Sequence, residues 1–319
     1  MPTPYENRFR AQAISSNADQ TEWDAIRRGS VVIDAGVRDD TISGAIEDID
    51  VGDGGDDGPP GSEPWAEADL RMDAEVGGIR EELERRHGLM NETYPFRLDG
   101  ERLIYVQSVS GFYEFCLAIC QAESITRKPF TKLPRGFERL SAKIIQYYMG
   151  TDAVSFHVGW PRDEAIGRNF KTAMKHLELI PYEWIWSPED GKPEEPAPRN
   201  AKDEGIDFVV MKKLMDERAG RLYVLGQCAC GDDWNTKWNE LSEARLRKWF
   251  RTTALVPFVR AFSTPFLLAD EMLREATAQA GLVFDRARLT KIVELHANAV
   301  EIAEVADHVR PMSEMVLAA

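Results

Sequence analysis

Two oxygen-bearing side chains occupy apolar segments of this sequence in which charged or amide groups are unusual. Asp207 lies near the start of the segment 206–211, and Gln227 lies near the end of the segment 222–229. Both segments are rich in β-branched and apolar residues, and a turn-rich connection joins them, which predicts a β-hairpin. Because side chains alternate across a strand, we expect Asp207 and Gln227 to lie opposite each other on antiparallel neighbours.

This pair of side chains could bind a divalent cation. A carboxylate inside an apolar strand is costly to bury without a counter-charge, and a metal ion is one such partner. Magnesium accepts carboxylate oxygens, amide or backbone carbonyl oxygens, and waters. A third acid, Glu138, belongs to a helix predicted over 136–149. For each residue alone there is a structural alternative, in which Asp207 caps a turn and Gln227 satisfies a backbone group.

Three short motifs place these residues in a defined order. Gly136-Phe-Glu138 begins a helix, Gly205-Ile-Asp207 opens a strand, and an apolar strand ends at Gln227. In this order and context they resemble the PD-(D/E)XK nuclease superfamily, and specifically its restriction-endonuclease-like branch, in which Gln replaces the second acid. The resemblance covers roughly residues 135–240.

The resemblance implies a mixed β-sheet flanked by helices that hydrolyses phosphodiester bonds with Mg²⁺ or Mn²⁺. Carried over position by position, Asp207 would be the main metal ligand and Gln227 the second ligand. Glu138 would be a helix-borne acid that touches the metal or its water. The metal would polarise the phosphate and lower the pKa of a water, while a nearby cation would offset charge on the phosphorane.

The sequence departs from the family pattern at the cation. The pattern places Lys two residues after the Gln, and this sequence has Ala229 there. Related nucleases can supply the lysine from an adjacent helix, so we expect Lys237, ten residues past Gln227, to take this role. Lys212 and Lys213 are the competing candidates.

The charge distribution leaves room for a nucleic-acid surface. The chain of 319 residues has a net charge of −15, but residues 1–100 contain 10 Arg, no Lys and 23 acids, a net charge of −13. The rest is nearly neutral and can present a basic groove. Basic residues cluster twice in this part, over 127–143 and over 245–251. Either cluster alone could be a solvated helix face; together they predict a phosphate-binding surface. The predicted nucleic-acid-binding residues are Arg127, Lys128, Lys132, Arg135, Arg139, Arg245 and Lys248.

The chain is expected to be an α/β protein with three parts. Residues 1–100 form an acidic N-terminal region, partly disordered around 46–64, where Asp, Gly and Pro dominate. Residues 101–250 form the nuclease-like core, a mixed sheet flanked by helices. Residues 251–319 form a helical C-terminal region, since the chain beyond Trp234 is expected to be mostly helical.

Several other classes of protein are disfavoured. No export signal and no window of about 18 uncharged apolar residues is visible, so we expect a cytoplasmic protein that does not span a membrane. The spacings C-x₃-C and C-x-C favour core packing over a zinc site. No phosphate-binding loop occurs, so any ATP-driven step would need a separate ATPase, helicase or sensor subunit. Homo-oligomerisation is left open.

We therefore expect a magnesium-dependent DNA endonuclease of the bacterial restriction or anti-phage defence type; the defence context is an analogy. One alternative is a catalytically inactive subunit that keeps the fold and binds nucleic acid or scaffolds a complex. Another is that the acidic N-terminal region mimics nucleic acid and occludes the groove until it is displaced.

Overall fold

The computed structural model describes most of the chain, and the chain divides into two units, residues 1–108 and 109–319. The described residues are 4–33, 64–162, 170, 172–174, 183–186, 205–216, 218–247, 249–252 and 256–319. The expected disorder over 46–64 falls, except for its last residue, outside the described residues.

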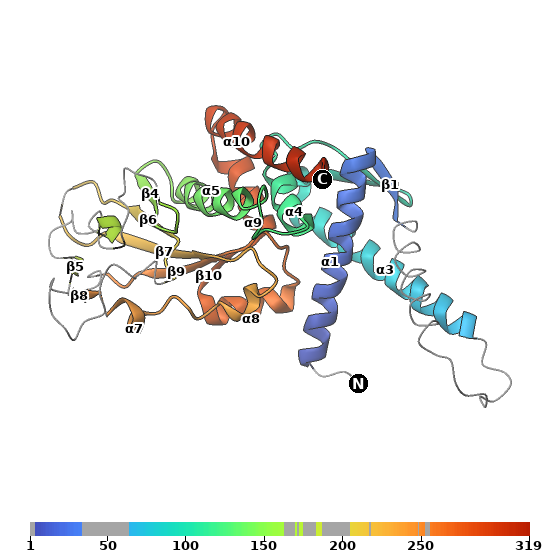
Figure 1. Cartoon of the computed structure of the whole chain (residues 1–319), viewed down its shortest axis with the longest axis horizontal. Coiled ribbons are helices and arrows are strands. Elements are labelled where there is room, and N and C mark those ends of the chain that lie inside the picture. The colour runs from blue at the N-terminus through green and yellow to red at the C-terminus, as the bar shows by residue number, and fades with distance from the viewer. Residues whose placement is uncertain are drawn as a thin grey trace. The chain divides into compact units, whose positions relative to one another are not determined.

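The first unit contains two long helices and a small antiparallel sheet (Figure 1). Helix α1 (Pro4–Arg28) packs against α3 (Pro64–Met90), and a single 3₁₀ turn, η1 (Asn91–Thr93), follows α3. The sheet has the order β1-β3-β2. Its strands are β1 (Ser30–Val32), β2 (Phe96–Asp99) and β3 (Arg102–Tyr105). Gly100 turns the β2–β3 hairpin at φ +60°, a conformation that favours glycine.

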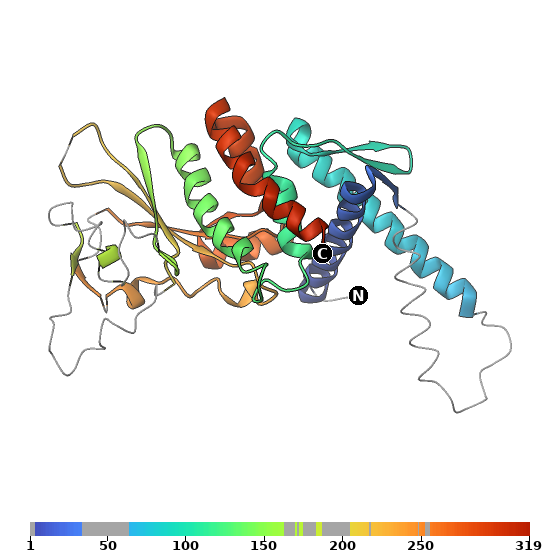
Figure 2. The same cartoon turned by 45° about the horizontal axis from the view of Figure 1, so that its top comes forward.

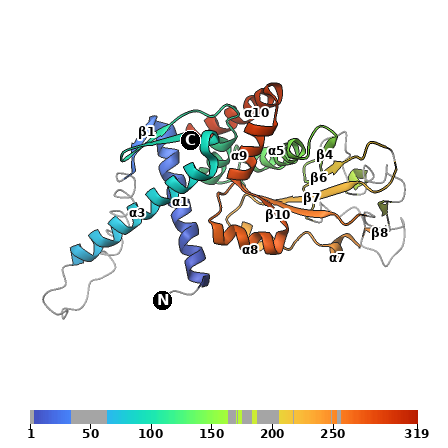
Figure 3. The ribbon, with the colours of Figure 1, turned by 180° about the vertical axis from the view of Figure 1, so that it is seen from behind.

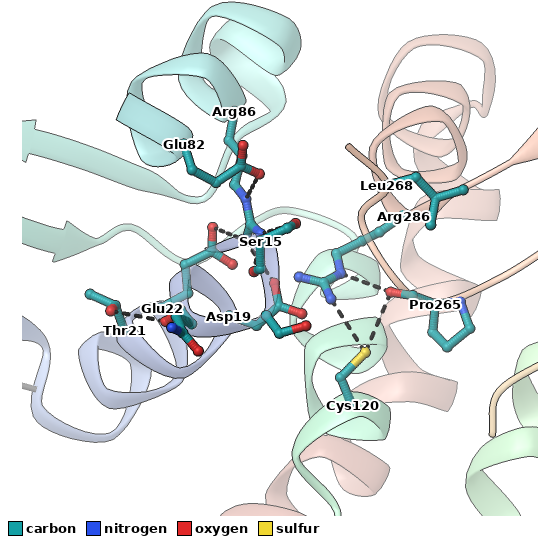
Figure 4. A network of polar contacts seen from close by, with 12 residues as sticks. Ser15, Asp19, Thr21, Glu22, Glu82, Arg86, Cys120, Pro265, Leu268 and Arg286 are labelled. Atoms are coloured by element: carbon teal, nitrogen blue, oxygen red, sulfur yellow. Dashed lines mark hydrogen bonds and ion pairs between the residues drawn. The ribbon is translucent and has the colours of Figure 1, made fainter. Parts of the chain in front are cut away.

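A buried arginine ties the two helices of this unit together (Figure 4). Arg86 of α3 is fully buried, and its guanidinium binds Glu82 on the same helix at 2.9 Å. It also binds Asp19 at 2.7 Å and Glu22 at 2.9 Å, both on α1. A buried guanidinium is tolerated only when it is paired in this way, so the network holds α1 on α3.

The second unit is built on a five-stranded mixed sheet of order β10-β9-β7-β6-β4. Strands β4, β6 and β7 are antiparallel neighbours, whereas β9 runs parallel to β7 and β10 runs parallel to β9. The strands are β4 (Ala153–His157), β6 (Phe208–Lys212), β7 (Leu222–Cys228), β9 (Val259–Ser263) and β10 (Leu282–Phe284). A separate antiparallel pair joins β5 (Ile185–Trp186) to β8 (Phe250–Thr252).

Helices cover both faces of this sheet, as Figures 1 and 3 show. Helices α5, α9 and α10 lie on one face and α8 lies on the other, and Figure 2 shows α10 running alongside α5. The helices are α4 (Phe112–Gln121), α5 (Lys132–Met149), α7 (Glu243–Leu246), α8 (Asp270–Ala280), α9 (Arg286–His296) and α10 (Ala299–Leu317), with the 3₁₀ turn η3 (Trp234–Thr236). Among the described residues, no helix combines the length and the apolar character needed to cross a bilayer.

Strand β6 is buried on both faces. On the face away from α5, Val209 and Met211 pack in a core with Leu225 and Trp249. Helix α5 contacts β4, β6 and β7 and buries its apolar positions, which include Phe137. Two covered faces explain why this strand is a continuous apolar run and does not alternate between apolar and polar residues.

The predicted fold class, an α/β chain with a mixed sheet flanked by helices and a helical C-terminus, is confirmed. The expectation of mostly helix beyond Trp234 missed the strands β8, β9 and β10. The division between the two units, after Ser108, differs from the predicted boundary at 100. The part beyond residue 251 supplies two strands to the central sheet, so it is not a separate helical region.

Candidate active site

Glu138 and Asp207 meet at the backbone of Gly159. Glu138 lies in the second turn of α5, and Asp207 immediately precedes β6. A side-chain carbon on Gly159 would lie 2.9 Å from Glu138 Oε2 and 3.1 Å from Asp207 Oδ1. The two carboxylate oxygens are therefore no farther apart than the sum of these distances. Residues far apart in sequence thus form a compact acidic pair at one end of the sheet.

Backbone hydrogen bonds on both sides hold Asp207 in place. Its N–H donates to the Gly226 carbonyl at 2.8 Å, and its carbonyl accepts from Val158 N at 2.7 Å and Gly159 N at 2.8 Å. Its side-chain Oδ2 accepts from Cys228 N at 2.6 Å. These bonds extend the sheet by one residue before the start of β6, so Asp207 is held between the segment that follows β4 and strand β7.

His157, the last residue of β4, is the third group at this point. Its Nε2 lies 3.1 Å from Glu138 Oε2 and 3.2 Å from the position of a side-chain carbon on Gly159. The ring is buried, and its Nδ1 has no hydrogen-bond partner within the described part of the chain. Because a carboxylate only accepts, the contact requires the proton on Nε2. His157 was not among the predicted site residues, because its only signal in the sequence is its place at the end of an apolar strand.

Gln227 lies in register with Asp207. Phe208 pairs with Gly226, so the next step of the antiparallel ladder places residue 207 opposite 227. Gln227 is buried, and its amide Nε2 donates to Glu240 Oε2 at 2.6 Å. Glu240 follows η3 in an irregular segment, and its approach to β7 depends on the path of the intervening loop. No local sequence pattern marks it as a partner of Gln227.

Two thiols, those of Cys228 and Cys230, lie close enough to the acidic pair to feel its negative charge. Burial raises the pKa of the Cys228 thiol well above its usual value, and the negative charges of Asp207 and Glu138 raise it further. Burial likewise raises the pKa of the Cys230 thiol, with Glu138 the next contribution. Both thiols are therefore neutral, and the negative charge at the end of β7 comes from the carboxylates.

The donor set fits a hard cation with few protein ligands. Two carboxylates lie at this end of the sheet, with Gln227 in register opposite Asp207, and Mg²⁺ is usually held by one or two carboxylates with several waters. Within the described ranges, no group of three or more His, Cys, Asp or Glu side chains is arranged to hold a metal ion. The donor chemistry of two carboxylates is one that a magnesium or manganese ion with several waters accepts.

A buried alanine occupies the position at which the PD-(D/E)XK pattern has its lysine. Ala229 is buried, and its backbone is bonded to Ser263 and Thr264. Lys237 is partly exposed, at 30%, and its Nζ forms an ion pair with Asp233 Oδ1 at 3.0 Å. Its role as the catalytic cation stays a prediction.

The competing lysines lie at the other end of β6 from Asp207. Lys212 is the last residue of the strand, and its Nζ donates to the Met149 carbonyl at 2.5 Å. Lys213 follows it and is exposed.

Most of the predicted phosphate-binding cations lie at the end of α5 that carries Glu138. Arg127, Lys128, Lys132 and Arg135 are exposed and form no ion pair with another described residue. Arg139 is partly buried and donates to the Pro161 carbonyl at 3.2 Å.

The second predicted cluster is only partly described. The exposed Arg245 donates to the Glu240 carbonyl at 3.1 Å, which ties it to the loop that follows η3. Lys248 lies outside the described residues.

Comparisons with known proteins add little to this geometry. No protein-family model matches the chain, and no curated protein matches it. Among solved structures, the MspJI restriction endonuclease in complex with a 27-mer oligonucleotide is similar at 13% identity and a TM-score of 0.27. The match covers 66% of this chain and 38% of that chain, so this chain spans well under half the length of that protein. A likeness of this size carries no functional argument.

Proposed function

We propose that this protein is a magnesium-dependent endonuclease that hydrolyses phosphodiester bonds in DNA. The observation that carries the proposal is the meeting of Glu138 and Asp207 at Gly159, with Gln227 in register opposite Asp207. These are the residues of the motif that resembles the PD-(D/E)XK superfamily; Asp207 and Gln227 belong to the mixed sheet, and Glu138 lies on α5, a helix that packs against it. The fold class that the resemblance implies therefore supports the proposal.

Each residue has a distinct role in this proposal. A bound metal would polarise a phosphate oxygen and lower the pKa of a water. Asp207 and Glu138 would hold it through carboxylate oxygens, and Gln227 would hold it through its amide oxygen. Lys237 would offset the charge on the reacting phosphate. The backbone bonds to Asp207 reduce the reorganisation that binding would need, because its carboxylate is already held by Cys228 N.

The cations near α5 would bind the DNA backbone. Arg127, Lys128, Lys132 and Arg135 are exposed, and none forms an ion pair with another described residue, so their charges are available to phosphates. Phosphate contacts of this kind position a duplex without reading its sequence. They lie at the same end of α5 as Glu138, which suits a backbone passing the acidic pair.

Cleavage of supercoiled plasmid with Mg²⁺ tests the proposal, with Asp207→Asn as the main variant. The asparagine keeps an oxygen that can accept from Cys228 N but loses the charge, so cleavage is expected to fall about 100-fold or more while the fold is retained. Asp232→Asn, which changes the same charge at an exposed position, is the matched control. Equal cleavage by wild type and Asp207→Asn would remove Asp207 from the mechanism.

A non-catalytic role is the second candidate, and it is favoured by the absence of lysine at the position where the family pattern has one. Ala229 is buried where the family pattern has its lysine, and Lys237 is paired with Asp233. A subunit of this kind would bind nucleic acid or scaffold a complex without cutting. Duplex binding without cleavage in either Mg²⁺ or Mn²⁺ would favour it over the nuclease. For the nuclease, we propose a cytoplasmic defence setting with a separate ATPase, helicase or sensor subunit, by analogy alone.

A further inference from the structure

The contact between Gln227 and Glu240 determines how the amide is oriented. The amide Nε2 donates to Glu240 Oε2 at 2.6 Å, and Gln227 is buried in β7. A reversed amide would place its oxygen against the carboxylate oxygen at this distance, and two acceptors repel. The contact therefore keeps the amide nitrogen toward Glu240 and leaves the amide oxygen turned away from it.

The same contact makes an acid at position 227 costly. A glutamate there would set two carboxylates within hydrogen-bond distance of each other beside the Glu138 and Asp207 pair. Like charges at such a separation cannot both ionise without a large cost. An amide avoids this cost because it donates to one carboxylate and still offers an oxygen on its other side.

Glu240 is itself held by its backbone. Its N–H donates to the Lys237 carbonyl at 3.1 Å, and its carbonyl accepts from Arg245 Nη1 at 3.1 Å. The backbone of Glu240 also lies 3.4 Å from the position of a side-chain carbon on Gly205, which has φ +81° and opens the segment that leads to Asp207. Glu240 thus joins β7, the Asp207 segment and the turn that carries Lys237.

We propose that Glu240 is a positioning residue for Gln227: it sets the orientation of the amide and is the reason that position 227 carries Gln where an acid is usual. The metal-ligand part of this inference rests on the proposed function. Through its backbone bond to Lys237, the same residue also anchors the turn that bears the candidate catalytic cation.

Exchanging the two side chains tests the pairing without any metal. The variants are Gln227→Glu, Glu240→Gln and the double exchange, with Glu243→Gln as a control that removes one exposed acid from the same stretch of chain. In metal-free protein at neutral pH, Gln227→Glu is expected to lower the unfolding midpoint by about 5 °C or more. The double exchange restores one carboxylate and one amide and should recover most of that loss. Equal midpoints for wild type and Gln227→Glu, or no recovery in the exchange, overturn the proposal.

Manganese binding, measured by calorimetry with MnCl₂ alone, tests the positioning role. Glu240→Gln is expected to weaken Mn²⁺ binding about tenfold, because a supporting group that orients a ligand is lost. The double exchange should bind at least as tightly as wild type, and Glu243→Gln should be unchanged. Wild-type affinity in Glu240→Gln overturns the positioning role. If the wild type binds no Mn²⁺ and cuts no DNA although the exchange restores stability, the proposed function fails and the pairing of Gln227 with Glu240 stands.

Discussion

Glu138 Oε2 and Asp207 Oδ1 lie 2.9 Å and 3.1 Å from the point where a side chain on Gly159 would begin. Because Gly159 has no side chain, the carboxylates of Glu138 on α5 and Asp207 before β6 can both approach its backbone this closely. Val158 and Gly159 donate to the main-chain carbonyl of Asp207, so the same loop also holds the backbone of Asp207 in register. The meeting of the two acids thus depends on a glycine at this position.

Gly159→Ala is expected to damage the site more than the fold. The added methyl group would displace the carboxylate ends of Glu138 and Asp207, which are flexible side-chain termini, so the loss of stability should be no more than about 1–2 kcal/mol. Plasmid cleavage should fall about 100-fold, because the acidic pair is misplaced. Gly88→Ala, in α3 with nothing within 4 Å, is the control and should cut normally. Full activity in Gly159→Ala would contradict the shared site.

Lys237 is expected to supply the catalytic cation. Lys237→Ala should lower kcat about 100-fold or more, whereas Asp233→Asn, which removes the ion-pair partner of Lys237, should leave kcat equal or higher. Steady-state cleavage of a labelled duplex measures both effects, with the exposed Lys213→Ala as the control. Wild-type kcat in Lys237→Ala would exclude this lysine and favour the non-catalytic candidate if no other lysine variant lowers the rate.

The exposed cations of the first turns of α5 are expected to bind phosphates. The double variant Lys132→Ala with Arg135→Ala should weaken duplex binding and lower the slope of log Kd against log salt by about 1 for each phosphate that is no longer neutralised. Fluorescence anisotropy in Ca²⁺, which replaces Mg²⁺ to prevent cleavage, measures the slope. Arg97→Ala, an exposed arginine in the first unit, is the matched control. An unchanged slope in the double variant would place the DNA elsewhere.

The first unit is expected to lose stability on acidification through Glu82. Burial alone would raise the pKa of Glu82, but the hydrogen bond from Arg85 and the charges of Arg86 and Arg85 outweigh it and lower the pKa below 4.5. A lowered folded pKa means that the stabilisation is present above the unfolded value and is lost as pH falls through the folded value. Hydrogen exchange of the α1 and α3 amides between about pH 6 and pH 3 measures this loss of stability.

Two variants of the first unit check this assignment. Glu82→Gln should be less stable than wild type at pH 6 and should show a shallower acid dependence, because the titrating carboxylate is gone. Glu84→Gln, an exposed acid paired with Arg80, is the control and should keep the wild-type acid dependence. An identical profile for Glu82→Gln and wild type would assign the acid sensitivity to other carboxylates.

The hairpin was predictable because strand patterns are local. Side chains point alternately to the two faces of any strand, and this geometry, with the turn-rich connection, placed Asp207 opposite Gln227; the observed register of Phe208 with Gly226 agrees. The short parallel strands β9 and β10 were not predicted. Parallel partners are separated by long crossovers, and the three residues of β10 form too short a run to distinguish a strand from helical sequence.

The residue types, the order of the motifs and the α/β class were determined by the sequence alone, since side-chain chemistry and strand periodicity do not depend on distant contacts. Only the tertiary structure decided that His157 and Glu240 join Glu138, Asp207 and Gln227. Most of these contacts join separate elements through loops whose paths depend on the packing of the whole second unit. For this reason the acids of the site could be identified from sequence, but not the side chains that orient them.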